Sequence, residues 1–592
     1  MGIDATTQAA NAHLTTPTPL TGSEILWATL VGEGVDTVFG YPGGAILPAY
    51  DALRKFPIRH VLVRHEQGAA HMADGYARAS GRVGVAIATS GPGATNLITG
   101  IATAMLDSIP MVCITGNVPS KVLGTDAFQE VDITGITLPV TKHNFLVSRA
   151  EDLAAALRQA FQIAQSGRPG PVLVDITKDA QQATAVFDFE AAKPKPYRPH
   201  PMLKVEESGL AQAADLIRNA QRPVILAGHG VSESGAMEQI RTLAERAQIP
   251  VGLTLLGLGS FPASHPLNLG MMGMHGEKWV NDAIQEADLL IACGMRFDDR
   301  VIGKPSTYAP KAKKIHIEID PAEINKNIKV DVALVGDLRS VLEDLLPRIS
   351  SRSQGGRDGS PWLKWIDARK GESAVRDIKN IPDMGHLYAA HVMHDLWRIT
   401  DGNAIIVTDV GQHQMWEAQY YHHEHPRSLV TSGGLGTMGF ALPAAIGAKF
   451  ACPEKEVWVI AGDGGFQMTA AELSTIVQEK LKINIAVINN GYLGMVRQWQ
   501  EFFYDRNYEA TPLVSPDFVK LADAHGIAAR AVRTRGEVAA AVEEARSAKG
   551  AFLLNFLVEK EDSVYPMIPA GSSLHEMILR PGKDPLEERA DD

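Results

Sequence analysis

An aspartate and an asparagine follow two apolar runs in the last third of the chain. Asp463 lies in a Gly-Asp-Gly turn after Val457–Ala461, and Asn490 follows 27 residues later, after Ile483–Ile488. A strand–helix–strand crossover of this length would bring both side chains to the carboxyl edge of a parallel sheet, where such sheets bind ligands. Carboxylate and amide oxygens suit Mg²⁺, and the flanking glycines let backbone N–H groups approach a diphosphate. An ordinary glycine-rich turn is the alternative, but the paired asparagines at this spacing favour a magnesium–diphosphate site.

A glutamate in the first third of the chain is a candidate proton carrier. Glu66 stands where the apolar run His60–Val63 meets a helical stretch, Glu66–Ser80. An acid at the start of a helix commonly does no more than complement the helix dipole. The local pattern alone leaves both roles open.

The elements around these residues predict an α/β fold of three doubly wound domains with mainly parallel sheets, because short β-rich apolar runs alternate with helical patterns. The expected strands of the first domain are Thr37–Phe39, His60–Val63, Val83–Thr89, Met111–Thr115 and Val172–Ile176. Those of the second are Val224–Ala227, Leu289–Cys293 and Lys314–Ile319. Those of the third are Ala404–Val407, Val457–Ala461, Ile483–Ile488 and Phe552–Phe556. We expect a flexible tail at 1–20, domains at 21–190, 205–350 and 386–570, a linker at 351–385 and a C-terminal tail at 571–592.

Composition excludes several classes of protein. The 592 residues are 45% hydrophobic and 21% charged, which is typical of a soluble globular protein. The net charge of −12 without a long basic run argues against nucleic acid or an anionic membrane as a partner. Three isolated cysteines form no disulfide framework, and no apolar run is long enough to span a membrane. We therefore expect a cytoplasmic enzyme.

The Gly-Asp-Gly turn followed by two asparagines resembles the motif of thiamine-diphosphate-dependent enzymes. The resemblance implies that Asp463, Asn490 and the main-chain oxygen of Tyr492 hold Mg²⁺. It implies that Glu66 binds the pyrimidine N1′, so that the 4′-nitrogen takes up the C2 proton. Further cofactor contacts are implied at Val410, Gly411, Gln412, His413, Gly436, Met438, Gly462 and Gly464. Within this set the Gly436 carbonyl would accept from the 4′-amino group, and Met438 would hold the two rings in a bent conformation.

Stretches along nearly the whole chain are similar to one branch of these enzymes, the acetolactate (acetohydroxyacid) synthase large subunits. They include the segments FGYPGGAILPAYD, GTDAFQE, GMMGMHG, MRFDDR and GMVRQWQ. The resemblance implies joining a two-carbon unit from pyruvate to pyruvate or 2-ketobutyrate. It places the Gly44 backbone beside the reacting carbon and Phe128, Gln129 and Lys178 at the entrance. Arg300 would orient the acceptor's carboxylate through its planar fork of donors. Trp499 would narrow the acceptor pocket. Taken singly, Arg300 could be a surface ion-pair partner, Trp499 a core residue and His413 a structural histidine.

The middle of the chain carries the expectation of FAD. Gly228 and Gly230 follow the apolar run Pro223–Ala227 and open a helix, a loop that admits a phosphate. The resemblance adds Arg168, Thr254, Met274, His275, Arg296, Glu318 and Asp337. A separate match to a dinucleotide fingerprint, at residues 434–439, lacks the acidic residue expected about twenty positions on and is weak.

The resemblance also implies a homo-oligomer whose active sites are shared between chains, together with a small regulatory subunit. The enzymatic alternative is an FAD-using pyruvate oxidase or another thiamine-diphosphate carboligase. A catalytically silent paralogue would lack Glu66, Asp463 or Asn490, and all three are present. A flavin- or nicotinamide-dependent oxidoreductase would need a second dinucleotide fingerprint, which the sequence does not contain.

Overall fold

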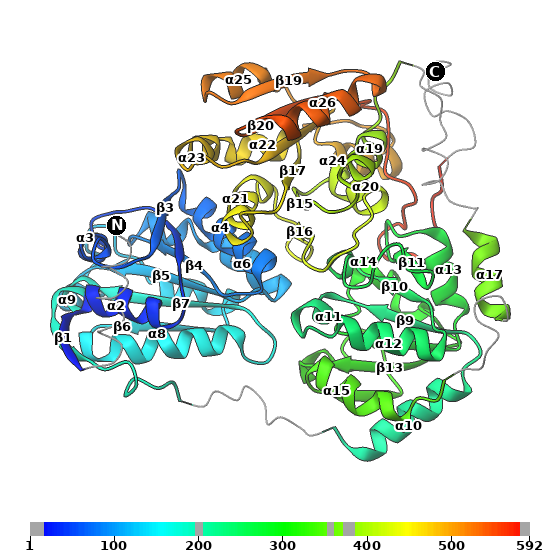
Figure 1. The fold of residues 1–592 in the computed structure, drawn as a ribbon, viewed down its shortest axis with the longest axis horizontal. Coiled ribbons are helices and arrows are strands. Elements are labelled where there is room, and N and C mark those ends of the chain that lie inside the picture. The colour runs from blue at the N-terminus through cyan, green and yellow to red at the C-terminus, as the bar shows by residue number, and fades with distance from the viewer. Residues whose placement is uncertain (1–16, 196–204, 352–359, 371–384, 581–592) are drawn as a thin grey trace.

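This computed structural model describes residues 17–195, 205–351, 360–370 and 385–580. Within them the chain folds into three six-stranded sheets, each built only of parallel strands. The first domain lies beside the central domain, and the third domain packs across both (Figure 1). Helices follow the strands and cover the sheets, because strands buried on both faces need an apolar partner on each side. The predicted fold class is confirmed.

The first domain contains the sheet β3-β2-β4-β5-β7-β6. Its strands are β2 (Thr37–Gly40), β3 (Arg59–Leu62), β4 (Gly84–Ala88), β5 (Met111–Asn117), β6 (His143–Val147) and β7 (Pro171–Thr177). Helix α4 (Glu66–Ser80) starts after β3 and ends at Gly81, whose positive φ of 73° suits glycine. Its bounds match the helical stretch read from the sequence.

The central domain contains the sheet β11-β10-β9-β12-β13-β14. Its strands are β9 (Pro223–Ala227), β10 (Val251–Leu253), β11 (Asn268–Met271), β12 (Leu289–Cys293), β13 (Lys313–Glu318) and β14 (Val332–Val335). Numbered within the domain, this order is 3-2-1-4-5-6, and the chain reverses direction across the sheet between β9 and β12. Sheets of this order bind nucleotides at the carboxyl ends of the strands beside that switch point.

The third domain contains the sheet β16-β15-β17-β18-β20-β19. Its strands are β15 (Ile405–Thr408), β16 (Leu429–Thr431), β17 (Val457–Gly462), β18 (Asn484–Asn489), β19 (Ala528–Val532) and β20 (Phe552–Leu557). β17 and β18 are direct neighbours, with Gly462 opposite Ile488. The residues that follow these two strands therefore emerge side by side.

The first and third domains of one chain share a core through α4 and α21 (Ala441–Ala451). A Cβ on Gly75 would lie 2.1 Å from the Ala444 oxygen, and one on Gly447 would lie 1.9 Å from the Met72 oxygen. The two helices therefore approach backbone to backbone, and glycine is required at both crossing points. This contact fixes the first domain against the third within each chain.

The structure corrects the expected tails and linker where they fall on described residues. Thr18–Thr21 form β1, which pairs with β8 (Thr184–Phe187), so the end of the predicted tail is held by a sheet. Helix α17 (Pro361–Arg369) lies within the predicted linker, and its Trp362 indole donates to the Pro223 oxygen. Residues 1–16, most of 351–385 and 581–592 lie outside the described residues.

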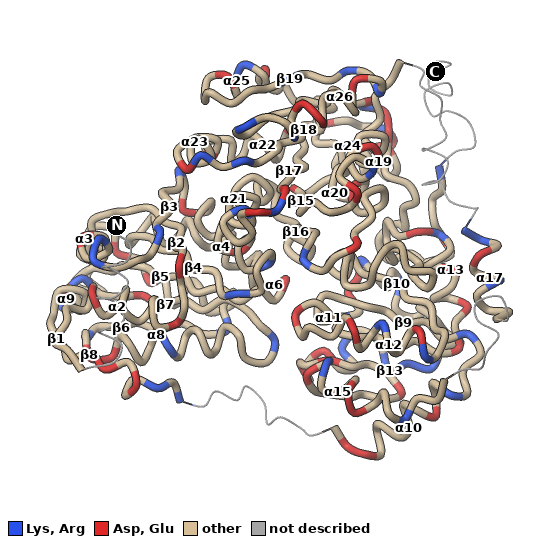
Figure 2. The backbone as a smooth tube through the Cα atoms, viewed as in Figure 1, with Lys and Arg blue, Asp and Glu red and all other residues tan. Residues whose placement is uncertain are grey.

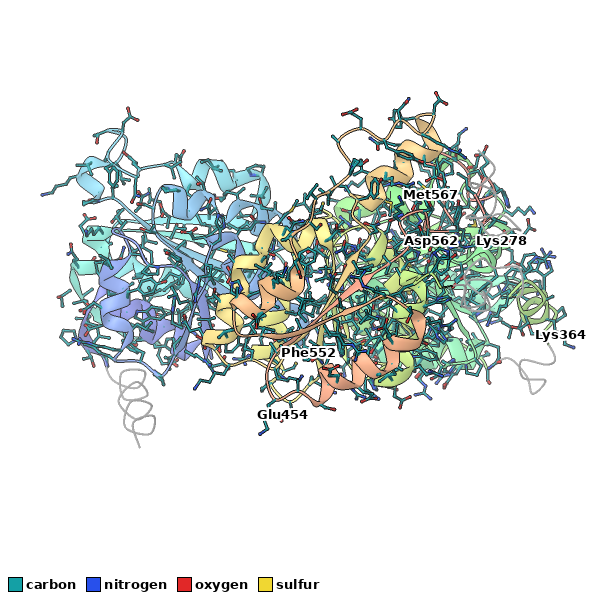
Figure 3. All side chains as sticks on the ribbon, turned by 90° about the horizontal axis from the view of Figure 1, so that it is seen from above. Lys278, Lys364, Glu454, Phe552, Asp562 and Met567 are labelled. Atoms are coloured by element: carbon teal, nitrogen blue, oxygen red, sulfur yellow. The ribbon has the colours of Figure 1, made fainter. Side chains whose placement is uncertain are left out.

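The last described segment is not a loose tail either. It passes through Asp562 and Met567 (Figure 3) and turns back, so that Met567 and Ile578 form an antiparallel bridge. Arg580 pairs with the buried Asp562 at 2.9 Å. The Ile568 N–H donates to the Met274 oxygen, which joins the third domain to the central one.

Positions of Lys and Arg are interspersed with positions of Asp and Glu along the backbone (Figure 2). In the described residues, helices of membrane-spanning length and apolarity are absent.

Candidate active site

Asp463 and Asn490 both lie at the carboxyl edge of the third sheet, after neighbouring strands. Asp463 is the first residue of α22 (Asp463–Thr469), directly after β17, and Asn490 follows β18. The Ser515 hydroxyl donates to one Asp463 oxygen at 2.8 Å. Burial raises the pKa of Asp463, and the Ser515 hydroxyl opposes that shift. A buried carboxylate beside an amide oxygen is a donor set that a divalent cation would stabilise.

The side chain of Asn490 lies against Gln412, the first residue of α20 (Gln412–Tyr420). The Asn490 amide donates to the Gln412 oxygen at 3.3 Å, while the Asn490 oxygen accepts the Tyr492 N–H at 3.1 Å. Gln412 in turn donates to Gln498 at 2.8 Å. These bonds orient the Asn490 oxygen toward the turn that includes Tyr492. The described residues contain no group of three His, Cys, Asp or Glu side chains arranged to hold a metal ion. The candidate site instead combines one carboxylate with amide and carbonyl oxygens.

His413 is neutral and holds the glycine turn. Burial lowers its pKa to about 4. Its Nε2 accepts the Gly462 N–H at 3.2 Å, and a Cβ on Gly462 would lie 2.9 Å from the ring. Gly464 is also crowded, since its Cβ would lie 2.8 Å from Leu493. The sequence reading linked His413 to the diphosphate; the structure places it against the turn that would carry that diphosphate.

One cavity of about 1010 Å³ runs between the third and central domains and is also bordered by the first domain near Asp107 and Arg168. From the third domain it is lined by Val410, Gly411, Gly436, Met438 and Trp499. Arg300 reaches the same cavity from the central domain, where its side chain is half-exposed and donates to the Met274 sulfur at 3.4 Å. The structure thus brings Arg300 and Trp499, 199 positions apart in the sequence, to the lining of one cavity.

The other end of this cavity lies over the carboxyl edge of the central sheet. Gly228 and Gly230 follow β9, and Gly294 follows β12. A Cβ on Gly228 would lie 2.4 Å from the Gly294 oxygen, and one on Gly230 would lie 2.7 Å from the Gly294 Cα. Only glycine fits this close approach. The lining also includes the residues Arg168, Gly230, Thr254, Met274, His275, Arg296, Glu318 and Asp337.

Burial shifts the pKa values of two side chains at this end of the cavity. Glu318 ends β13, and burial raises its pKa to about 7. Burial also lowers the pKa of His275 to about 4, and its Nδ1 lies 3.1 Å from the Pro566 oxygen. Arg168, from the first domain, donates to Ser108 at 2.8 Å and to Glu323 at 2.9 Å. Arg168 and Arg296, together with Glu318 and Asp337, suit the phosphates and hydroxyls of a dinucleotide, in a lining that mixes polar and apolar residues.

The first-domain candidates gather at the carboxyl edge of their own sheet. Glu66 follows β3, Gly44 follows β2, and Lys178 follows β7. Asn96 donates to Glu66 at 2.9 Å. Gln129 has a positive φ of 59°, and the neighbouring Phe128 is 87% exposed. Within one chain, none of Glu66, Gly44, Gln129 and Lys178 is among the described residues that line the cavity.

Three family models match the three domains in order. They are described as "Thiamine pyrophosphate enzyme, N-terminal TPP binding domain" at residues 20–136, the central domain at 210–345 and the "C-terminal TPP binding domain" at 409–556. The acetolactate synthase large subunit of Corynebacterium glutamicum is 49% identical over 99% of this chain and 95% of its own length. The acetolactate synthase of Mycobacterium bovis is 48% identical over 96% of this chain and 93% of its own length.

The chain belongs to the acetolactate synthase family of thiamine-diphosphate enzymes. A probable acetolactate synthase large subunit of Methanocaldococcus jannaschii, an archaeal relative, is 46% identical over 94% of this chain and 95% of its own length. The family resemblance read from the sequence is confirmed.

Sequence reasoning on this acetolactate synthase family member missed the residues that orient the expected ligands. Gln498 lies beside Gln412, and Ser515 lies beside Asp463. Gln498 is in the same motif as Trp499, so its proximity to the site was a usable signal. Ser515 lies in a loop 52 residues after its partner, and no local pattern points to it.

Proposed function

We propose that this chain decarboxylates pyruvate and joins the resulting two-carbon unit to pyruvate or 2-ketobutyrate, giving 2-acetolactate or 2-aceto-2-hydroxybutyrate. One observation carries the proposal: a cavity lined by Gly436, Met438, Arg300 and Trp499 borders the domain whose sheet edge carries Asp463 and Asn490. Membership of the acetolactate synthase family supports it.

Asp463, Asn490 and the Tyr492 main-chain oxygen would hold Mg²⁺ and, through it, the diphosphate of thiamine diphosphate. When bound, the cofactor supplies a nucleophilic carbon and an acceptor for the electrons left when CO₂ departs. Gln412, Gly462 and Gly464 would approach the diphosphate, with His413 supporting the turn. The Gly436 carbonyl and Met438 would hold the pyrimidine ring, with Val410 and Gly411 beside it.

Glu66 would hold a proton at the pyrimidine N1′, and so favour proton uptake at the 4′-nitrogen. Asn96 is its orienting partner in the chain. Gly44, Gln129 and Lys178 lie at the same sheet edge and would line the entrance for the keto acid. Arg300 would bind the acceptor's carboxylate, since a guanidinium offers two parallel donors to it. Trp499 would limit the size of the acceptor.

FAD is proposed for the other end of the cavity. The backbone is open to a phosphate where Gly228 and Gly230 pack against Gly294 without side chains. Arg168 and Arg296 supply positive charge. Glu318 and Asp337 offer carboxylates at the ends of neighbouring strands. Thr254, Met274 and His275 complete the wall.

A homodimer with shared sites is proposed because the first-domain candidates and the cavity lie apart in one chain. Exposed apolar side chains flank both halves: Phe128 at the first sheet edge and Met468 and Val514 beside Asp463. A second copy of the chain would cover both sets, by placing the Glu66 edge of one protomer over the Asp463 edge of its partner. Relatives named large subunits also support a small regulatory subunit as a further partner.

The proposal is tested by a colorimetric acetolactate assay with pyruvate, with thiamine diphosphate, Mg²⁺ and FAD added in all combinations. Acetolactate should form only when thiamine diphosphate and the metal are both present. Acetyl phosphate formed with phosphate, or electrons passed to a quinone, would instead assign a pyruvate oxidase. Full activity in chelated, thiamine-free protein would refute the proposal.

A further inference from the structure

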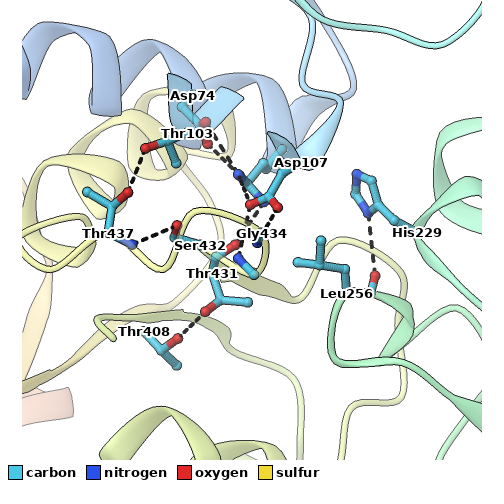
Figure 4. Close-up of polar contacts among 12 residues, drawn as sticks. Asp74, Thr103, Asp107, His229, Leu256, Thr408, Thr431, Ser432, Gly434 and Thr437 are labelled. Atoms are coloured by element: carbon cyan, nitrogen blue, oxygen red, sulfur yellow. Dashed lines mark hydrogen bonds and ion pairs between the residues drawn. The ribbon is translucent and has the colours of Figure 1, made fainter. Parts of the chain in front are cut away.

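The loop Ser432–Met438, which would hold the pyrimidine ring, is fastened by a helix of the first domain of the same chain. It follows β16 and runs past the end of α6 (Ile98–Asp107). Asp107 accepts the N–H of Gly433 at 3.0 Å through one oxygen and that of Gly434 at 2.6 Å through the other (Figure 4). One turn earlier on α6, the hydroxyls of Thr103 and Thr437 lie 2.7 Å apart.

Asp107 is itself oriented by a buried arginine. Arg78 donates to Asp107 at 2.8 Å and to the Thr431 oxygen at 2.8 Å, and it also pairs with Asp74. Arg78 and Asp107 are 4% and 2% exposed. A buried charged group is costly to leave without a partner, so the pairing with Arg78 fixes the direction of the Asp107 oxygens.

The start of the loop has no room to shift. A Cβ on Gly433 would lie 2.8 Å from the Leu256 Cγ of the central domain. One on Gly434 would lie 2.8 Å from an Asp107 oxygen. All three domains therefore meet at these two glycines, beside the cavity that Asp107 also lines.

The far end of the loop is held from within the third domain. Asp409 accepts the N–H groups of Gly439 and Ala441 at 3.0 to 3.1 Å. Between the two fastened ends, Leu435 is 41% exposed, and a Cβ on Gly436 would meet only Val410, at 3.8 Å. The loop is thus rigid at both ends and open toward the cavity in the middle.

We propose that Asp107, assisted by Thr103, is a positioning residue for thiamine diphosphate, holding the Gly436 carbonyl where the 4′-amino group must donate. The inference rests on the proposed function, which assigns Gly436 to that contact. A displacement of about 1 Å in a positioning group costs enzymes up to about a hundredfold, so the fastening has a functional consequence.

The test compares two ligands that differ at the 4′ position only. Isothermal titration, with Mg²⁺ present, measures the dissociation constants of thiamine diphosphate and of oxythiamine diphosphate, which carries an oxygen in place of the 4′-amino group. Asp107→Asn should weaken thiamine diphosphate binding about tenfold and oxythiamine diphosphate binding less than about twofold. Equal loss for both ligands, or no loss for either, overturns the proposal.

Two controls keep the outcome decisive. Asp175→Asn alters another buried carboxylate of the first domain, bonded to Thr115 and Asn117, and should leave the ligand ratio unchanged. Asp463→Ala should weaken both ligands alike, since it acts at the diphosphate end. If Asp107→Asn fails to fold, Thr103→Val with the same ligand pair decides. If wild-type protein binds neither ligand, the proposed function itself is refuted. If wild-type protein binds both ligands and the variants lack the expected difference, only the role of Asp107 is refuted.

Discussion

The carboxylate of Glu472, in the third domain, accepts the backbone N–H of Arg64, in the first domain, at 3.0 Å. The same oxygen accepts the His65 N–H at 3.2 Å, and the Thr475 hydroxyl donates to the other oxygen at 2.6 Å. A buried acid 408 residues away in sequence therefore fixes the turn directly before Glu66. The position of the candidate proton carrier depends on the contact between two domains of one chain.

Glu472→Ala should lower both stability and turnover. It leaves two backbone N–H groups unpaired, at about 1–3 kcal/mol for each buried group, while the Thr475 hydroxyl keeps the Leu62 oxygen at 3.4 Å. Turnover should fall about tenfold, because the turn that positions Glu66 loses its hydrogen bonds to Glu472. Thermal unfolding and steady-state kinetics measure the two effects, and Glu454→Ala, at an exposed turn, is the control. A folded variant with wild-type kcat would show that Glu472 has no part in placing Glu66.

Ser515→Ala should weaken Mg²⁺ binding without abolishing it. The hydroxyl orients one oxygen of Asp463, and losing such a supporting bond costs metal sites about tenfold or more in affinity. Activity titrated with Mg²⁺ at fixed thiamine diphosphate gives the shift. Ser208→Ala, in the central domain, should titrate like wild type. An unchanged metal requirement in Ser515→Ala would detach Ser515 from the site.

Trp499→Leu should relax the choice between acceptors. The indole lines the cavity, and a pocket wall discriminates one methylene by about 1–3 kcal/mol. The ratio of 2-aceto-2-hydroxybutyrate to 2-acetolactate should therefore fall about tenfold. Competition between pyruvate and 2-ketobutyrate measures that ratio. Phe503→Leu alters the ring 5.4 Å from the Trp499 ring but outside the cavity lining, and should leave the ratio unchanged. The same ratio in Trp499→Leu as in wild type would assign Trp499 to packing alone.

Glu318 should make the FAD-free protein less stable as pH rises. Burial raises its pKa to about 7 from 4.5, so between these values the unfolded chain has lost the proton that the folded chain keeps. The contribution of Glu318 to the free energy of unfolding is therefore largest below about pH 4.5, falls by about 3 kcal/mol by pH 7 and is constant above that. Glu318→Gln should remove that slope, because the amide does not titrate.

Thermal unfolding of flavin-free protein at pH 5 and pH 8 measures the Glu318 effect. From pH 5 to pH 8, the melting temperature of Glu318→Gln should rise relative to that of wild type. Glu343→Gln, at a half-exposed carboxylate, should follow wild type. A parallel decline of Glu318→Gln and wild type would show that Glu318 titrates normally.

Local pattern was enough for the interior strands of the first and third sheets, but it missed the short interior strand β10 of the central sheet and the sites between domains. β12 and α4 have the bounds read from the sequence, because a buried strand is continuously apolar and α4 ends at a glycine. The edge strands β6 and β19 are partly exposed, so their sequences lack that signal.

Contacts across domains leave no trace in local sequence. Asp107 and Gly434 are 327 positions apart, and nothing around Asp107 distinguishes it from a helix-end acid. The candidate ligands Asp463 and Asn490 could be predicted, since both follow apolar strands of one crossover. Their supporting residues, Ser515 and Gln498, became visible only once the sheet edge was assembled.

In the proposed homodimer, Glu66 and Asp463 serve one thiamine diphosphate from two different chains. Mixing Glu66→Gln protein with Asp463→Ala protein tests this directly, since each variant alone should be nearly inactive. At equal amounts about half of the dimers are mixed, and each mixed dimer has one site free of both lesions, so about a quarter of wild-type activity should return. No recovery, with mixed dimers demonstrated by two affinity tags, would contradict the claim and place each site within a single chain.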